Sequence, residues 1–194
     1  MVAPQPARAA DGGFTLTELM VTVVIVGILA AMATPLMTRD RQQNEVRAFS
    51  ASVARDFQRA RTQAISERLP IHAYIFRDRI EYRIARTGVA PGDPPILPTL
   101  ADPVLRVLPA KEDITILAVT TAPTAPVGQV LTTAAGAEIQ FNTLGGITVI
   151  GQPQWSPAFV WIRNRMLSAG HPYRNARVEV AALTGFVRLL EGLP

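Results

Sequence analysis

The sequence predicts an α+β protein in which a long, kinked N-terminal helix packs against antiparallel β-sheets. Three observations lead to this prediction: an apolar stretch near the N-terminus, a following segment whose apolar residues recur every three or four positions, and short alternating segments from residue 71 onward. A chain of 194 residues with 48% hydrophobic content has room for one ordinary domain and an anchoring segment, but not for two large domains.

The first predicted element is an apolar helix over residues 14–35. Residues 19–33 carry no charge, and the whole stretch has roughly the 20 residues that a helix needs to cross a bilayer. Glu18 interrupts the stretch near its start, and a carboxylate at bilayer depth costs on the order of 2.5 to 3.5 kcal/mol. Two interpretations therefore stay open: Glu18 lies at the level of the lipid headgroups, or it has an oppositely charged partner.

Residues 36–70 are predicted to continue this helix with a different character. Their apolar residues recur at helical spacing and form one face, while charged residues occupy the other. The predicted apolar face consists of Val46, Phe49, Val53, Phe57, Ala60 and Ala64. Pro35 lies between the two halves and lacks the amide hydrogen of a regular helical bond, so we expect a kink there. Leu69-Pro70 should end the helix.

From residue 71 the apolar period falls to two, which predicts strands. Residues 71–75 and 80–84 should form a hairpin around the turn at residues 77–79. Further strands are expected at residues 114–119, 138–141, 158–162, 176–181 and 186–190, with Thr184-Gly185 as the last hairpin turn. Six prolines between Gly88 and Pro109 predict a surface loop, because proline interrupts regular hydrogen bonding.

Composition excludes several classes of function. The chain has no cysteine, which rules out disulfides, thiolate metal sites and cysteine nucleophiles. His72 and His171, the only histidines, lie about 100 residues apart, and no acidic cluster has metal-ligand spacing. We therefore predict that the protein is not an enzyme and has no cofactor and no small-molecule substrate. The net charge of +4 permits a nucleic-acid partner without requiring one.

The segment Gly13-Phe14-Thr15-Leu16-Thr17-Glu18-Leu19 and the apolar run after it resemble the N-terminal signature of type IV pilins and type II secretion pseudopilins. The resemblance implies that a prepilin peptidase cleaves between Gly13 and Phe14 and removes residues 1–13 as a leader. It further implies N-methylation of Phe14 and pairing of Glu18 with the N-terminal amine of a neighbouring subunit. The spacing of four residues would put that amine and the Glu18 carboxylate on one helix face.

Three later segments resemble the narrower GspH/FimT branch of pseudopilins and minor pilins: residues 57–65, 139–146 and 176–190. The resemblance implies a minor pseudopilin or minor pilin that is assembled into a filament, either a type II secretion pseudopilus for protein export or a type IV pilus. The sequence does not choose between the two, and we take the type II secretion pseudopilus as the main expectation. Its partners would be the prepilin peptidase, other major and minor pilins or pseudopilins, and the assembly platform of the inner membrane.

The same resemblance implies a location and a division into segments. Residues 14–35 would cross the bacterial inner membrane once, residues 36–70 would form the amphipathic half of the helix, and residues 71–194 would form a periplasmic or extracellular domain. Charge alone indicates the opposite orientation, because only Arg8 precedes the apolar run while Arg39, Arg41 and Arg47 follow it. We give the cleavage motif more weight than this count.

An alternative function for a protein of the same fold is DNA binding. Some FimT-type minor pilins of type IV pili bind DNA during uptake, and arginine binds phosphate well. The candidate contacts are Arg163, Arg165, Arg174, Arg177 and Arg188. The C-terminal motif of such proteins has a glycine followed by two closely spaced arginines, whereas this chain has Gly185-Phe186-Val187-Arg188, with phenylalanine in place of one arginine.

Overall fold

The computed structural model of the chain describes residues 14–84, 103–124, 126, 131–133 and 136–193; the side chains of residues 32–40, 42–43 and 193 lie outside this description. The chain divides into two compact units, Met1–Asp40 and Arg41–Pro194. One helix, α1 (Leu16–Glu67), is followed within the described residues by the strands β1 (Ile71–Ile75), β2 (Arg79–Ile84), β3 (Val104–Pro109), β4 (Ile114–Thr120), β5 (Ala137–Phe141), β6 (Ile147–Val149), β7 (Ala158–Asn164), β8 (Asn175–Val180) and β9 (Val187–Leu193).

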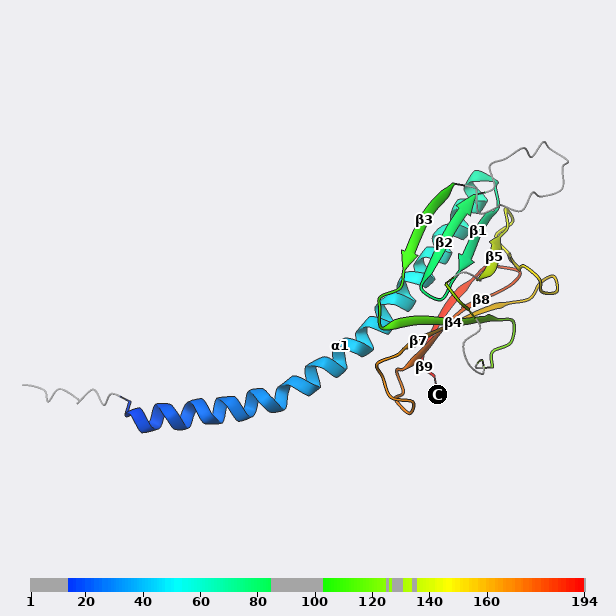
Figure 1. Cartoon of the computed structure of the whole chain (residues 1–194). Coiled ribbons are helices and arrows are strands. Elements are labelled where there is room, and N and C mark those ends of the chain that lie inside the picture. Colours follow the sequence, from blue (N-terminus) through cyan, green and yellow to red (C-terminus); the bar gives the residue numbers. More distant parts are fainter. Residues whose placement is uncertain (1–13, 85–102, 125, 127–130, 134–135, 194) are drawn as a thin grey trace, which may run out of the picture. The chain divides into compact units, whose positions relative to one another are not determined.

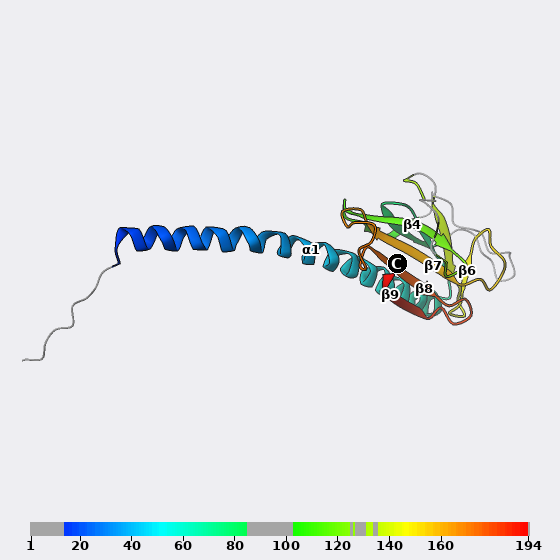
Figure 2. The ribbon, with the colours of Figure 1, turned by 90° about the horizontal axis from the view of Figure 1, so that it is seen from below.

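The strands form two antiparallel sheets. The first sheet has the order β3-β2-β1-β5-β6, and the second has the order β4-β7-β8-β9. Figure 1 shows β3, β2 and β1 side by side beside the C-terminal part of α1, and Figure 2 shows the strands of the second sheet from below. The predicted α+β class, with a long N-terminal helix and antiparallel sheets, is therefore confirmed.

The C-terminal part of α1 supplies one wall of the core to both sheets. All six residues of the predicted apolar face are buried, and they share one core cluster with residues of the first and second sheets. Phe57 is fully buried, with its ring centroid 6.3 Å from that of Tyr82 and 5.5 Å from that of Phe141. The helical period in this segment thus predicted its packing correctly, because burial follows directly from which residues share a face.

The two predicted hairpins are also confirmed. β1 and β2 pair from Ile71 opposite Ile84 to Ile75 opposite Ile80. β8 and β9 pair around a turn in which Gly185 has a φ of 60°, a backbone conformation that favours glycine. The remaining predicted strands correspond to β4, β5 and β7, whereas β6, with three residues, was not anticipated.

The prediction of a surface loop from Gly88 to Pro109 is wrong for its last part. Residues 104–109 form β3, which pairs with β2 as the outer strand of the first sheet. Pro109 is tolerated because it lies opposite Arg79 at the end of an edge strand, where a proline need not donate to the ladder. Residues 88–102 of the predicted loop lie outside the described residues.

The helix ends close to its predicted end. α1 stops at Glu67, and Arg68 adopts a positive φ of 55° immediately before Leu69-Pro70. The kink predicted at Pro35 falls in residues 32–40, whose side chains lie outside the description, and it stays a prediction.

Two turns meet near the C-terminal end of α1. The β5–β6 turn and the β8–β9 turn are joined by a hydrogen bond of 2.8 Å from the Ile147 amide to the Ala182 carbonyl. Arg61 of α1 donates to the Gly145 carbonyl at 3.0 Å. A side chain at residue 185 would collide with the Gly145 carbonyl oxygen, so this close approach requires glycine. We call this arrangement the turn clasp.

The face of the first sheet that points away from α1 carries buried polar and charged side chains. His72 is fully buried, and its Nδ1 lies 2.5 Å from Glu138 Oε1. Glu81 accepts hydrogen bonds from Arg83 at 2.6 Å and from Arg79 at 2.7 Å. Burial alone raises the pKa of the Glu81 carboxyl, but the bonds from Arg83 and Arg79 outweigh it and hold that pKa below its ordinary value.

The lowered pKa of Glu81 makes its contribution to stability dependent on pH. The contribution is present above the pKa of the unfolded chain and is lost as the pH falls through the lower pKa of the folded state. Glu81→Gln should therefore lower the free energy of unfolding by about 1.5 to 3 kcal/mol at pH 7, the range for hydrogen bonds to charged groups. Chemical denaturation at pH 7 and again at pH 3 measures this difference, which should shrink at the lower pH.

The matched control for this experiment is Glu112→Gln, which removes a carboxylate from an exposed position. It should change the free energy of unfolding little at either pH. An equal loss for Glu81→Gln at both pH values would show that packing, and not charge, is what the variant disturbs.

Candidate functional site

The first candidate site is the N-terminal end of α1, where the sequence motif lies. The helix begins at Leu16, and Thr15 caps it: the Glu18 amide donates to Thr15 Oγ1 at 3.2 Å. Thr15 and Glu18 have the spacing of a capping box, in which a hydroxyl residue at the cap is followed three positions later by glutamate. Glu18 also lies in the first turn, where the helix dipole favours a negative charge.

Phe14 precedes the cap and is not part of the helix. The placement of the Phe14 amine and the Glu18 carboxylate on one helix face concerns the chain after the predicted cleavage, and it stays a prediction. Phe14 is 80% exposed, and Glu18 is exposed as well. Both groups thus remain open to contacts with other molecules. Gly13, on the other side of the predicted cleavage site, lies outside the described residues.

The helix that follows is apolar and exposed. Every side chain from residue 14 to residue 31 is exposed, including Leu16, Val23 and Leu29 at 80%, 62% and 60%. Water-soluble proteins rarely expose so continuous an apolar surface, and such surfaces mark contacts with a partner or with lipid. Among the helices described, none has the length and apolar character required to pass through a membrane.

The second candidate site is a set of arginines on the second sheet. The register of β7, β8 and β9 places Arg163, Arg177 and Arg188 on the sheet face that points away from the core. Arg165 lies just beyond the end of β7, and Arg174 lies just before the start of β8. The structure therefore brings three of the five predicted arginines to one face and leaves two at its end.

Some of these arginines already bind other groups of the protein. Arg177 donates to Glu179 Oε1 at 2.5 Å and to the Pro123 carbonyl, and its guanidinium lies 5.0 Å from the Trp161 ring centroid. Arg163 donates to Asn175 Oδ1 at 3.0 Å. Burial and the nearby positive Arg174 lower the pKa of Arg163. These contacts hold Arg177 and Arg163 within the fold and limit the charge that they offer to a ligand.

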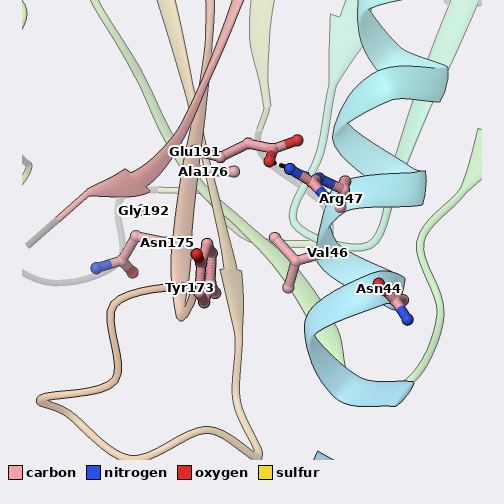
Figure 3. A pocket seen from close by; sticks show the side chains of 8 residues that line it. All are labelled: Asn44, Val46, Arg47, Tyr173, Asn175, Ala176, Glu191 and Gly192. Carbon is pink, nitrogen blue, oxygen red and sulfur yellow. Dashed lines mark hydrogen bonds and ion pairs between the residues drawn. The ribbon is translucent and has the colours of Figure 1, made fainter. Parts of the chain in front are cut away.

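A third feature is a small groove of about 120 Å³ between α1 and the second sheet (Figure 3). Asn44 and Arg47 line it from the helix, and Tyr173 and Asn175 line it from the opposite side. The Arg47 Nε lies 2.6 Å from Glu191 Oε2, so an ion pair joins the two walls. We interpret this groove as part of the attachment of α1 to the sheet.

Comparison with known families gives a match at the N-terminal end of the chain. Residues 8–34 match the model of the prokaryotic N-terminal methylation motif. This match covers the candidate cleavage site, Phe14, Glu18 and most of the exposed apolar helix. The chain therefore carries the N-terminal motif of prepilin-type proteins.

No curated protein matches the chain significantly. Among solved structures, two of the minor pseudopilin EpsH from the type II secretion system of Vibrio cholerae are similar to it, with 14% and 13% identity and TM-scores of 0.46 and 0.48. They cover 76% and 78% of this chain, and 97% of the EpsH chain in each case.

Sequence reasoning missed the role of Thr15. The signal was present, because a threonine three positions before a glutamate at the start of an apolar run is a typical helix start. Reading this pattern would have placed Phe14 outside the helix and Glu18 in its first turn.

Proposed function

We propose that this chain is a minor pseudopilin that a prepilin peptidase processes and that is assembled into a type II secretion pseudopilus for protein export. The observation that carries the proposal is the methylation motif over residues 8–34. Two further observations support this function. The helix start is capped directly after the proposed cleavage site, and the helix beyond it is apolar and exposed. The partners are then the prepilin peptidase, other pilins or pseudopilins and the inner-membrane assembly platform.

Each segment of the chain then has its own role. Residues 1–13 form the leader that the peptidase removes, and residues 14–35 anchor the chain in the bacterial inner membrane in a single pass. Residues 36–70 connect this anchor to the domain of residues 71–194, which lies in the periplasm. Exposure of the apolar residues 14–31 supports this assignment, because they need lipid or packed helices around them.

Phe14 and Glu18 then act in assembly. Phe14 becomes the N-terminal residue after cleavage, its amine is methylated, and methylation keeps the positive charge. Glu18 pairs with this amine on a neighbouring subunit, which offsets the cost of burying either charge alone among apolar helices.

DNA binding during uptake, the alternative for the same fold, stays a prediction that we do not adopt. Arg177 is paired with Glu179 and stacked on Trp161, and Phe186 replaces one arginine of the C-terminal motif.

Processing is the direct test of the proposed function. Co-expression with a prepilin peptidase should shorten the chain by its first 13 residues, and Gly13→Leu should leave the chain at full length because it removes the glycine after which the motif places the cut. Mass spectrometry of the purified chain measures both results.

The matched control is Gly27→Leu, which places the same side chain at a helical position with open space around it. This variant should be cleaved as the wild type is. An unchanged mass of the wild-type chain in the presence of active peptidase would contradict the proposed function.

A further inference from the structure

The outer edge of the first sheet is open. β3 pairs with β2 on one side, and among the described residues no strand pairs with its other side. Three of its apolar side chains are exposed: Val104 at 43%, Leu105 at 38% and Val107 at 45%. Natural sheets usually protect such an edge, because its unpaired backbone groups can accept another strand.

The direction of the free backbone groups follows from the pairing. The Ala110 amide donates to the Asp78 carbonyl at 2.8 Å, so it points toward β2. Because successive residues of an antiparallel strand point in opposite directions, the amide and carbonyl of Val107 point away from β2 and are open to a partner. Pro109 occupies the next outward position and has no amide to donate. A strand added here would therefore pair with residues 104–107.

A groove of about 220 Å³ lies beside this edge, between β3 and α1. Its apolar lining includes Ala60 and Leu105, and its polar lining includes Asp56, Tyr82 and Arg106. Tyr82 is only 4% exposed, and its hydroxyl has no hydrogen-bond partner among the described residues. A buried hydroxyl without a partner costs free energy, so the groove is chemically incomplete.

The hydroxyl of Tyr82 needs an acceptor. Burial raises the pKa of Tyr82 well above its ordinary value, and the nearby Asp56 adds to this effect against an opposing effect of Arg106. The group is therefore a protonated donor at neutral pH, and a carboxylate oxygen would be a strong acceptor for it.

The groove also has more positive than negative charge. Arg106 Nε lies 3.2 Å from Asp56 Oδ2, and Arg59 Nη1 lies 3.7 Å from Asp56 Oδ1. Two guanidinium groups thus share a single carboxylate. The side chains of Arg59 and Arg106 are 69% and 48% exposed, so both can reach an incoming group. One additional carboxylate would balance the charge.

We propose that β3 is a docking edge for an extended acidic segment of another protein subunit, which adds to the first sheet as a strand and places a carboxylate between Arg59 and Arg106, within reach of the Tyr82 hydroxyl. Backbone pairing along residues 104–107 supplies general affinity, and the carboxylate selects the partner.

A second copy of this chain fits the edge less well. β3 contains Arg106 and no acidic residue, so pairing of two β3 strands would bring two guanidinium groups together. It would also leave the Tyr82 hydroxyl without its acceptor. Charge complementarity therefore favours a different, acidic segment.

The test uses the full chain in detergent micelles and two synthetic peptides, acetyl-Ser-Thr-Val-Glu-Val-Thr-Ser-amide and the same peptide with glutamine in place of glutamate. Hydrogen exchange of the amides that point away from β2, among them the amide of Val107, measures pairing along β3. The glutamate peptide should protect these amides, and the glutamine peptide should need about tenfold higher concentration for the same protection. A third peptide, N-methylated at the amides that would face β3, should give no protection.

Variants of the protein identify which arginines cause the preference for the glutamate peptide. Arg106→Gln should reduce the tenfold preference for glutamate to less than about threefold, and Arg59→Gln, at an exposed helix position, should reduce it in the same direction without risk to the fold. Arg188→Gln, on the second sheet, is the matched control and should leave the preference unchanged.

Three outcomes would overturn the inference. Equal protection by the two peptides would show that the edge does not select an acidic partner. Protection by neither peptide would show that no strand adds to β3. Protection that grows with protein concentration in the absence of peptide would make a second copy the occupant. The inference stands apart from the proposed function, since leader cleavage and peptide docking are measured separately and either can fail alone.

Discussion

The Glu18→Val variant should enter the membrane fraction at least as well as the wild type and should be lost from filaments. Insertion becomes easier because the substitution removes a charge from the apolar segment. Assembly suffers because the N-terminal amine of a neighbouring subunit would be buried without its partner, and deleting one member of a buried pair costs about 3 to 5 kcal/mol. The two effects have opposite signs, so a general loss of protein cannot imitate them.

The measurement is paired: the abundance of the processed chain in membranes, and its recovery in sheared or cross-linked filaments. Two control variants separate charge from helix capping. Glu18→Gln removes the charge but keeps a side chain that can complete the capping box, whereas Thr15→Ala removes the cap hydroxyl and keeps the charge.

If charge pairing drives assembly, Glu18→Gln should behave like Glu18→Val, and Thr15→Ala should still assemble. Assembly of the valine variant at the level of the wild type would show that the pairing role is wrong for this subunit. A subunit at the filament tip, with no neighbour on one side, could give that result, so it would also inform on position.

The Phe57→Ala variant should lower the free energy of unfolding of the C-terminal unit by about 3 to 5 kcal/mol. The ring is fully buried and lies between Tyr82 and Phe141, so its removal leaves a cavity where the helix meets the first sheet. Chemical denaturation followed by the fluorescence of Trp161, which is buried on the second sheet, measures this loss.

Gln58→Ala, at the exposed neighbouring position of α1, is the matched control and should change stability by less than about 0.5 kcal/mol. A Trp161 signal that does not shift in Phe57→Ala would mean that the second sheet unfolds independently of the helix contact with the first. That result would contradict a single core shared by both sheets.

Much of the fold was predictable because it follows from local periodicity. The apolar face from Val46 to Ala64 and the hairpin of β1 and β2 both reflect which residues must share a side. β3 was missed because Pro103 before it and Pro109 at its end outweighed its short apolar run, and only the long-range pairing with β2 makes residues 104–109 a strand. β6, with three residues, is too short for alternation to be recognised.

The candidate sites also differ in whether local sequence is enough to predict them. The N-terminal motif lies within one continuous segment and could be read from the sequence alone. The arginines could not be placed, because the face of Arg163, Arg177 and Arg188 depends on the register of three strands. The groove beside β3 depends on Asp56, Tyr82 and Arg106, which come from three different elements.

The turn clasp has a mechanical consequence. The two sheets share no strand, and the C-terminal part of α1 packs on both. A pull on the helix from its Arg41 end would therefore act along the helix and load many of its core contacts at the same time. The far end of the helix is held by the hydrogen bond from Arg61 to Gly145 and by the contact of Gly145 with Gly185. Resistance of this kind is set by the rate of unfolding under force and not by equilibrium stability. The domain would then stay attached to its helix under such a pull.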